Sequence, residues 1–208
     1  MSHAASMALE GQRPMSGIGV YNQKFGMWVF LLSEVMFFTG LIGSYIILRF
    51  AHPEAFAAPG AVLNVPLTAA NTFILIVSSV TMVKAFAAIE SGDQAALKRW
   101  LLATVVLGVV FLSIQGIEYY KLAEHGFVPM VSLYAADGGP LYGMTFYTLT
   151  GFHGAHVSIG VGCMIFTTVK AFRGRYTQEN HGGVEVMGLY WHFVDLVWII
   201  LFTIVYLI

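Results

Sequence analysis

Acidic and imidazole side chains lie inside stretches of this sequence that are otherwise apolar. The last stretch, VMGLYWHFVDLVWIILFTIVYLI, contains His192 and Asp195, whose spacing places them on one face of a helix. An earlier stretch contains His153 and His156 with the same spacing, and the first contains Glu34. Imidazole and carboxylate groups bind zinc, iron and copper, so the two pairs could together form a metal site. The pattern His-x-x-His is by itself a weak indication of a metal.

Two other interpretations fit the same residues. A chain formed by Glu34, the histidines and Asp195 could carry protons, as such chains do in membrane pumps. Hydrogen bonds between helices could instead only fix how the first, fourth and fifth apolar stretches pack. At a rise of about 1.5 Å per residue, Glu34, His156 and Asp195 fall at a similar depth, which agrees with all three interpretations. The residues alone leave the choice open and favour hydrogen-bonded packing.

The composition indicates which elements must position these polar residues. Of the 208 residues, 58% are hydrophobic and only 10% are charged, and the mean hydropathy is +0.76, as is typical of an integral membrane protein. We therefore predict an all-α membrane protein, a bundle of five transmembrane helices that form one domain over residues 21–208. The expected spans are about residues 25–49, 65–89, 100–120, 141–170 and 186–208, and residues 1–20 are expected to form a mobile cytoplasmic tail.

The basic residues indicate how the bundle is oriented. With five spans, only Arg49 and Lys121 of the ten Lys and Arg residues lie on the side opposite the N-terminus. Cytoplasmic loops carry the excess of basic residues, so we predict that the N-terminus is inside and the C-terminus outside. The formal net charge of −1 indicates no binding of nucleic acid. The single cysteine, Cys163, excludes an internal disulfide and is expected to be a buried packing residue.

Polar residues near the ends of the spans have simpler interpretations. Glu118 lies about one turn inside Lys121, near the outer end of the third span, where aromatic and charged residues anchor a helix at the interface. Glu118 itself is expected to bond to another helix. Arg173 and Arg175 follow the fourth span, as is typical of residues that fix the topology or contact lipid headgroups.

Four motifs together resemble one family. SEVMFFTG in the first span, IQGIEYY in the third, TGFHGAHVSIG in the fourth and YWHFVDLVWIILFTIVYL in the last occur in the order found in subunit III of the haem-copper respiratory oxidases. The resemblance covers about residues 20–208. It implies a non-catalytic helical subunit of a proton-pumping terminal oxidase, with subunits I and II as partners. It further implies that haem and copper belong to the partner subunits, and that the chain binds phospholipid but no metal.

The resemblance also assigns roles to particular residues. Glu34 matches the family's buried carboxylate in the span that contains the SEV motif. Arg173 matches a basic residue that contacts a phospholipid phosphate in the family, with Arg175 as a near alternative. The histidines of the FHGAH motif and the two polar residues of WHFVD match family positions. We expect these four residues to form, with Glu118, a polar network that holds helices together. Its members are Glu118, His153, His156, His192 and Asp195.

This sequence departs from the longer members of the family, which have seven helices, two of them before the SEV motif. Five-helix forms are typical of bacteria, so the expected location is the bacterial cytoplasmic membrane. A lipid cleft would then need its other wall from another subunit.

The residues of the SEVMFF and IQGIEYY motifs favour a cytochrome c oxidase over a ubiquinol oxidase. Cytochrome c is not expected to bind at a site readable in this chain. The alternative is a protein of a different class, a stand-alone proton or small-solute channel through Glu34, His156 and Asp195.

Overall fold

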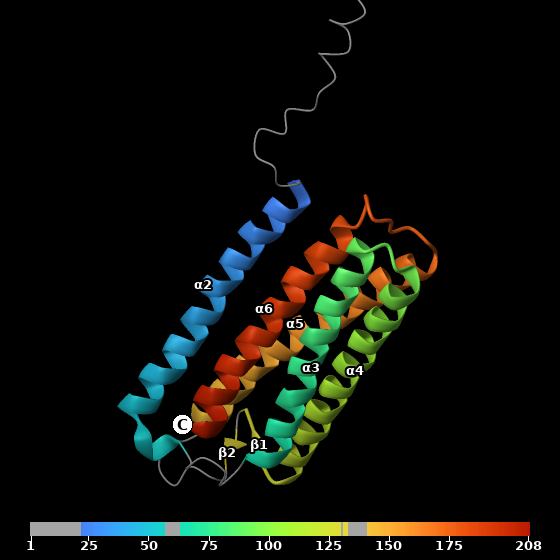
Figure 1. The fold of residues 1–208 in the computed structure, drawn as a ribbon. Helices are drawn as coiled ribbons and strands as arrows, with labels where there is room; N and C mark the ends of the chain where they lie inside the picture. The colour runs from blue at the N-terminus through green and yellow to red at the C-terminus, as the bar shows by residue number, and fades with distance from the viewer. Residues whose placement is uncertain (1–21, 57–62, 130, 133–140) are drawn as a thin grey trace, which may run out of the picture.

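The computed structural model describes residues 22–56, 63–129, 131–132 and 141–208. Five long helices run along one another within these residues (Figure 1). They are α2 (Asn22–Ala51), α3 (Val65–Glu90), α4 (Gln94–Glu124), α5 (Leu141–Phe172) and α6 (Gly182–Phe202), with a short 3₁₀ helix η1 (Pro53–Ala55) after α2 and a π-helical turn η2 (Thr203–Leu207) after α6. All five are long and apolar enough to cross a membrane, which confirms the predicted bundle. The tail predicted over residues 1–20 lies outside the described residues.

Side-chain caps set the beginnings of α3 and α4. Asn64 accepts a hydrogen bond from the backbone N–H of Leu67 at 3.1 Å, and Asp93 accepts one from the backbone N–H of Ala96 at 2.9 Å. Gly92 has a φ of +79°, in the left-handed region that favours glycine, and turns the chain sharply between the two helices. Because this turn is so short, α3 and α4 are antiparallel neighbours, and α4 begins before the expected start of its span.

A small hairpin follows α4, in the link between the third and fourth expected spans. Strand β1 (Phe127–Val128) pairs antiparallel with strand β2 (Val131–Ser132). Phe127 is buried, and its ring packs against Tyr142 and Phe146 of α5 with centroids 5.1 and 5.6 Å apart. Strands of two residues carry no alternating pattern that a sequence could reveal, so the hairpin was not predictable.

Helices α3 to α6 enclose the core, and α2 lies beside α6 at its edge (Figure 1). In the most apolar stretch of 18 residues of each helix, 11% of the residues are buried in α2, compared with 56% in the last helix. The core includes Trp191 and Trp198 of α6, both almost fully buried. Trp191 fits against two glycines: a Cβ atom at Gly108 would lie 3.0 Å from Trp191 Cη2, and one at Gly160 would lie 2.9 Å from Trp191 Cζ3. These glycines therefore make room for the Trp191 ring between α4 and α5.

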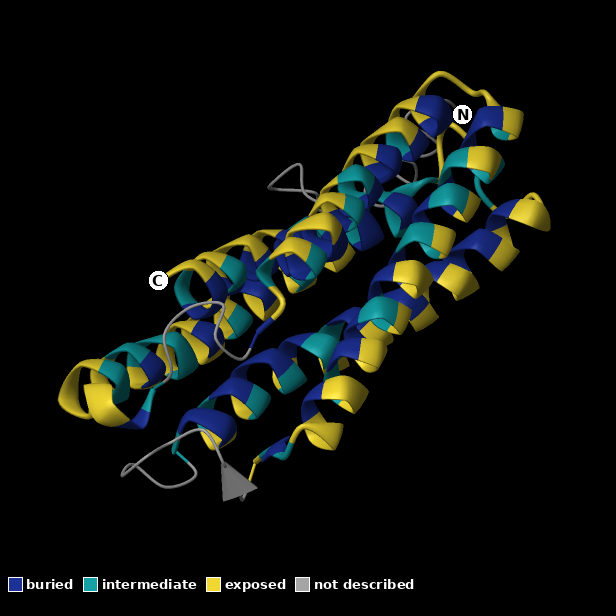
Figure 2. Cartoon of the chain, turned by 90° about the horizontal axis from the view of Figure 1, so that it is seen from below, coloured by how far each residue is buried: buried dark blue, intermediate teal, exposed yellow. Residues whose placement is uncertain are grey.

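The outward sides of the helices are apolar and exposed, as expected for helices in contact with lipid (Figure 2). Cys163 lies on such a side of α5 and is exposed. The prediction of a buried Cys163 is therefore wrong. Its physical reason is that lipid-facing and core-facing positions of a membrane helix are equally apolar, so hydropathy does not separate them.

Candidate functional site

Glu34 of α2 and His156 of α5 form a hydrogen-bonded pair. Glu34 Oε2 lies 3.0 Å from His156 Nε2, and His156 Nδ1 lies 2.7 Å from the carbonyl oxygen of Phe152. Because a carbonyl oxygen only accepts, Nδ1 carries a proton. One further proton therefore lies between Nε2 and the carboxyl group. The rings of Phe37 and Phe38 pack around the imidazole, which leaves the two side chains only 16% and 17% exposed.

His192 and Asp195 of α6 meet the same residue of α3. The hydroxyl oxygen of Ser79 lies 2.6 Å from His192 Nδ1, and this hydroxyl also faces the carboxyl group of Asp195. Asp195 is buried, and its Oδ1 has no hydrogen-bond partner among the described residues. On the neighbouring turn, Trp191 Nε1 donates to Ser78 Oγ at 3.0 Å. These contacts fasten α6 to α3.

Glu118 of α4 is buried at the opposite end of the bundle from the Gly92 turn. The Thr68 hydroxyl on α3 donates to Glu118 Oε1 at 2.9 Å, and the Tyr206 hydroxyl of η2 faces the same carboxyl group. The adjacent Tyr119 has its hydroxyl 2.5 Å from that of Thr150 on α5. Polar contacts at this end therefore join α4 to both α3 and α5.

His153 of α5 points into the core and is fully buried. Its ring stacks on Trp198 of α6 with centroids 4.8 Å apart, and it meets the edge of Phe111 of α4 at 6.3 Å. Neither ring nitrogen has a hydrogen-bond partner among the described residues. His153 and His156 thus contact different helices, although they are only three residues apart.

The structure brings the residues singled out in the sequence together in separate contacts. One contact joins Glu34 to His156, a second joins His192 and Asp195 to α3, and Glu118 lies apart from both. Within the described ranges, no group of three or more His, Cys, Asp and Glu side chains is placed to hold a metal ion. No hydrogen bond between described residues links the Glu34 contact to Asp195 in a continuous chain.

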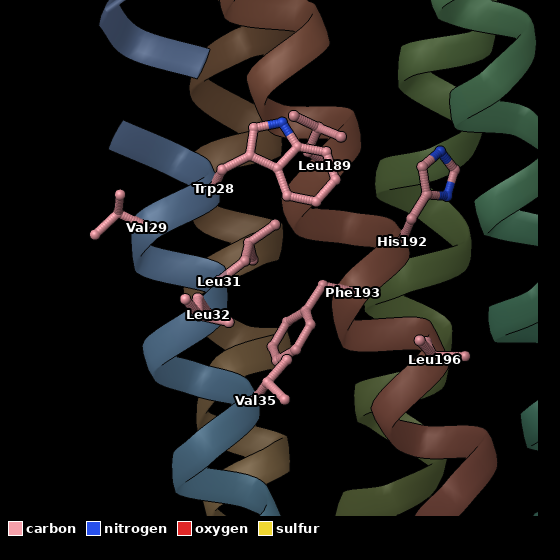
Figure 3. A pocket seen from close by; sticks show the side chains of 9 residues that line it. All are labelled: Trp28, Val29, Leu31, Leu32, Val35, Leu189, His192, Phe193 and Leu196. Carbon is pink, nitrogen blue, oxygen red and sulfur yellow. The ribbon is translucent and has the colours of Figure 1, made fainter. Parts of the chain in front are cut away.

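A cleft between α2 and α6 went unnoticed in the sequence (Figure 3). Its volume is about 570 Å³. The residues that line it are Trp28, Val29, Leu31, Leu32, Val35, Leu189, His192, Phe193 and Leu196. Only His192 among them is polar, and its Nδ1 is engaged by Ser79 of α3. The sequence could not show the cleft. Apolar residues lie all around α2, so their spacing does not reveal which side of the helix meets α6.

Polar contacts hold α2 near both of its ends. Lys24, in the first turn of α2, forms an ion pair with Glu185 of α6. In the last turn of α2, Arg49 donates to the hydroxyl of Tyr45 at 2.8 Å and to the carbonyl oxygen of Ile208 at 2.6 Å. The cleft lies between these contacts, along residues 28–35 of α2.

Comparison with known proteins decides the family. The sequence model described as cytochrome c oxidase subunit III matches residues 17–208. The chain belongs to this family. It is 39% identical over 184 residues to cytochrome c oxidase subunit 3 of Synechocystis sp., which covers 88% of this chain and 74% of that protein. It is 38% identical over 183 residues to a probable cytochrome c oxidase subunit 3 of Mycobacterium leprae, which covers 88% and 86%.

Membership of the cytochrome c oxidase subunit III family confirms the resemblance seen in the four motifs, which all lie within the matched residues. Together with the five apolar helices, it identifies a multi-pass membrane protein that is an oxidase subunit. A subunit III works within a complex, so other oxidase subunits are partners of this chain.

Two arginines follow the end of α5, and we expect them to contact lipid phosphate. Arg173 and Arg175 are both exposed, on either side of Gly174, whose φ of +67° ends the helix. Neither guanidinium group has a hydrogen bond or ion pair to another described residue. The next residue, Tyr176, packs over Gly183, and burial raises the pKa of its hydroxyl. The link is therefore held in place while both guanidinium groups remain available.

Proposed function

We propose that this chain is the subunit III of a bacterial cytochrome c oxidase and that it holds phospholipid acyl chains in the cleft between α2 and α6. In this role the chain has no catalytic centre. Electrons pass from cytochrome c to dioxygen at the haem and copper centres of the partner subunits, coupled to proton pumping. By holding lipid beside the core, the chain stabilises subunit I and supports its proton uptake. The open apolar cleft is the observation that carries the proposal.

The chemistry of the cleft favours an acyl chain over a polar ligand. It lies along the first half of α2, within the part of the helix expected to cross the hydrocarbon core. Its volume of about 570 Å³ falls within the roughly 300–1,000 Å³ of typical ligand sites. An empty apolar space here would lose the dispersion contacts that a hydrocarbon chain supplies. A flexible acyl chain can follow the uneven wall formed by Trp28 and Phe193 (Figure 3).

The headgroup of such a lipid needs a basic partner at the membrane surface. Arg173 and Arg175 are exposed beyond the end of α5, on the side expected to be cytoplasmic. A planar guanidinium group can bond two oxygens of one phosphate, which gives a stronger and more specific contact than a lysine would. We assign these arginines to phosphate contacts, independently of which acyl chain fills the cleft.

The proposal is tested by filling the cleft. Val35→Trp places a large ring in it, so the purified oxidase should retain less phospholipid and lose activity faster during turnover, with an unchanged haem spectrum. Val106→Trp on α4 is the matched control, because the two valines are 47% and 52% exposed and only Val35 lines the cleft. Equal lipid retention in the two variants would exclude lipid binding here. A chain that does not co-purify with a haem-copper core would exclude the oxidase role.

A further inference from the structure

We infer that the bundle contains an internal site for water beside His153, between α3, α4, α5 and α6. The site is separate from the cleft between α2 and α6 and does not rest on the proposed lipid binding. Its walls are the rings of Phe111 and Trp198, and its polar atoms come from His153, Gln115 and Asn71.

The first observation is the state of His153. The side chain is fully buried, and neither Nδ1 nor Nε2 has a hydrogen-bond partner among the described residues. A neutral imidazole has one N–H that donates and one nitrogen that accepts, so two hydrogen bonds are missing. Each buried polar group without a partner loses the free energy of its hydration. The hydrocarbon around a membrane helix bundle supplies no hydrogen bonds, so the missing partners must come from inside the bundle.

Two other unpartnered atoms lie around the same place. Gln115 Oε1 on α4 and Asn71 Oδ1 on α3 are both buried without a hydrogen-bond partner among the described residues. Gln115 reaches Gly154, the residue that follows His153 on α5, because a Cβ atom there would lie 4.0 Å from Gln115 Oε1. Asn71 is held near by its own amide, which donates from Nδ2 to the carbonyl oxygen of Phe111 at 3.2 Å.

Aromatic side chains connect these positions. Trp198 stacks on His153 and also donates from Nε1 to the hydroxyl of Thr72, the neighbour of Asn71, at 2.9 Å. Phe111, whose carbonyl holds Asn71, meets both Trp198 and His153 with its ring, at 5.2 and 6.3 Å. The contacts of Phe111, Trp198 and Gly154 therefore place the unpartnered side chains of three helices in the same part of the core.

The balance of donors and acceptors identifies the ligand as water. The missing partners comprise one donor, the N–H of His153, and three acceptors: the other imidazole nitrogen, Gln115 Oε1 and Asn71 Oδ1. The four atoms left without a partner cannot satisfy one another, because one donor cannot serve three acceptors. A water molecule supplies two donors and accepts from the imidazole N–H, so one or two waters complete the set. No carboxylate lies among these atoms to favour a cation.

The direct test uses the intact purified oxidase. A high-resolution map should show density that is not protein within hydrogen-bond distance of a nitrogen of His153 and of at least one of the two amide oxygens. Solid-state NMR of the complex labelled with ¹⁵N-histidine should show magnetisation transfer from water to a buried imidazole, and this signal should be absent in His153→Phe. A dry core with no such density and no such transfer would overturn the inference.

The same variant gives a second readout whose direction depends on the water. Phe keeps an aromatic ring against Trp198 but removes both ring nitrogens. If water is bound, His153→Phe deprives the water of a partner, and the chain should be released from the complex several-fold faster than the wild type in detergent. If the core is dry, the variant removes two unpaired polar atoms and should be released more slowly. Release that is slower or unchanged contradicts the inference.

Discussion

Gly160 offers the sharpest test of the packing between α5 and α6. A Cβ atom there would lie 2.9 Å from both Trp191 Cζ3 and Tyr190 Cε1, which is too close for either ring to stay in place. Both rings are also held by hydrogen bonds, Trp191 to Ser78 Oγ at 3.0 Å and Tyr190 to the carbonyl oxygen of His156 at 2.9 Å. Gly160→Ala must therefore shift a ring and weaken one of these bonds.

The size of the effect follows from three contributions. Overpacking of a dense core costs about 1–3 kcal/mol. A weakened hydrogen bond adds about 1 kcal/mol. The higher helix propensity of alanine offsets about 1 kcal/mol. The net loss of folding free energy for Gly160→Ala is therefore about 1–3 kcal/mol, which corresponds to a roughly 5- to 150-fold change in the folding equilibrium.

A glycine on the same helix provides the control. A Cβ atom at Gly162 would have nothing within 4 Å, so Gly162→Ala should leave the stability unchanged or slightly raised. Both variants are compared by SDS titration of the purified complex, which measures how much of the chain stays folded and bound. If Gly160→Ala and Gly162→Ala unfold at the same SDS fraction, α6 does not pack on α5 as the structure shows.

Two further variants test polar contacts. Thr68→Val keeps the shape of the side chain but removes the hydroxyl that donates to Glu118 at 2.9 Å. It should lower the free energy of unfolding by about 0.6–1.7 kcal/mol in the same titration, and an unchanged midpoint would show that this bond contributes nothing. Arg173→Ala combined with Arg175→Ala should lower the phospholipid retained by the complex, measured by mass spectrometry of extracted lipids. An unchanged lipid content would remove both arginines from phosphate binding.

Length and hydropathy were sufficient to predict the five helices, because a bilayer fixes how long an apolar helix must be. The motifs were sufficient to predict the family. The contacts of the polar residues were not predictable in the same way. His153 and His156 were expected to share a face, yet an offset of three residues on a helix still turns a side chain by about 60°, given 3.6 residues per turn. This difference sends one imidazole to Trp198 and the other to Glu34.

Two other features escaped the sequence because hydropathy measures only whether a residue avoids water. It does not distinguish a side chain that faces another helix from one that faces lipid. Cys163 was therefore expected in the core although it lies on the outside of α5. For the same reason the apolar residues Leu32 and Val35 gave no sign that they line a cleft.

The way in which α2 is attached has a consequence for the order of assembly. Helices α3 and α4 share an extensive contact and a capped turn, so they can enter the membrane as one hairpin. Helix α2 buries only three of its residues, compared with eleven in α6. Polar contacts of Lys24, Glu34 and Arg49 also hold it. Fewer buried contacts give a lower free energy of local opening. We therefore expect α2, although it precedes the other four helices in the chain, to dock after them and to leave the bundle before them.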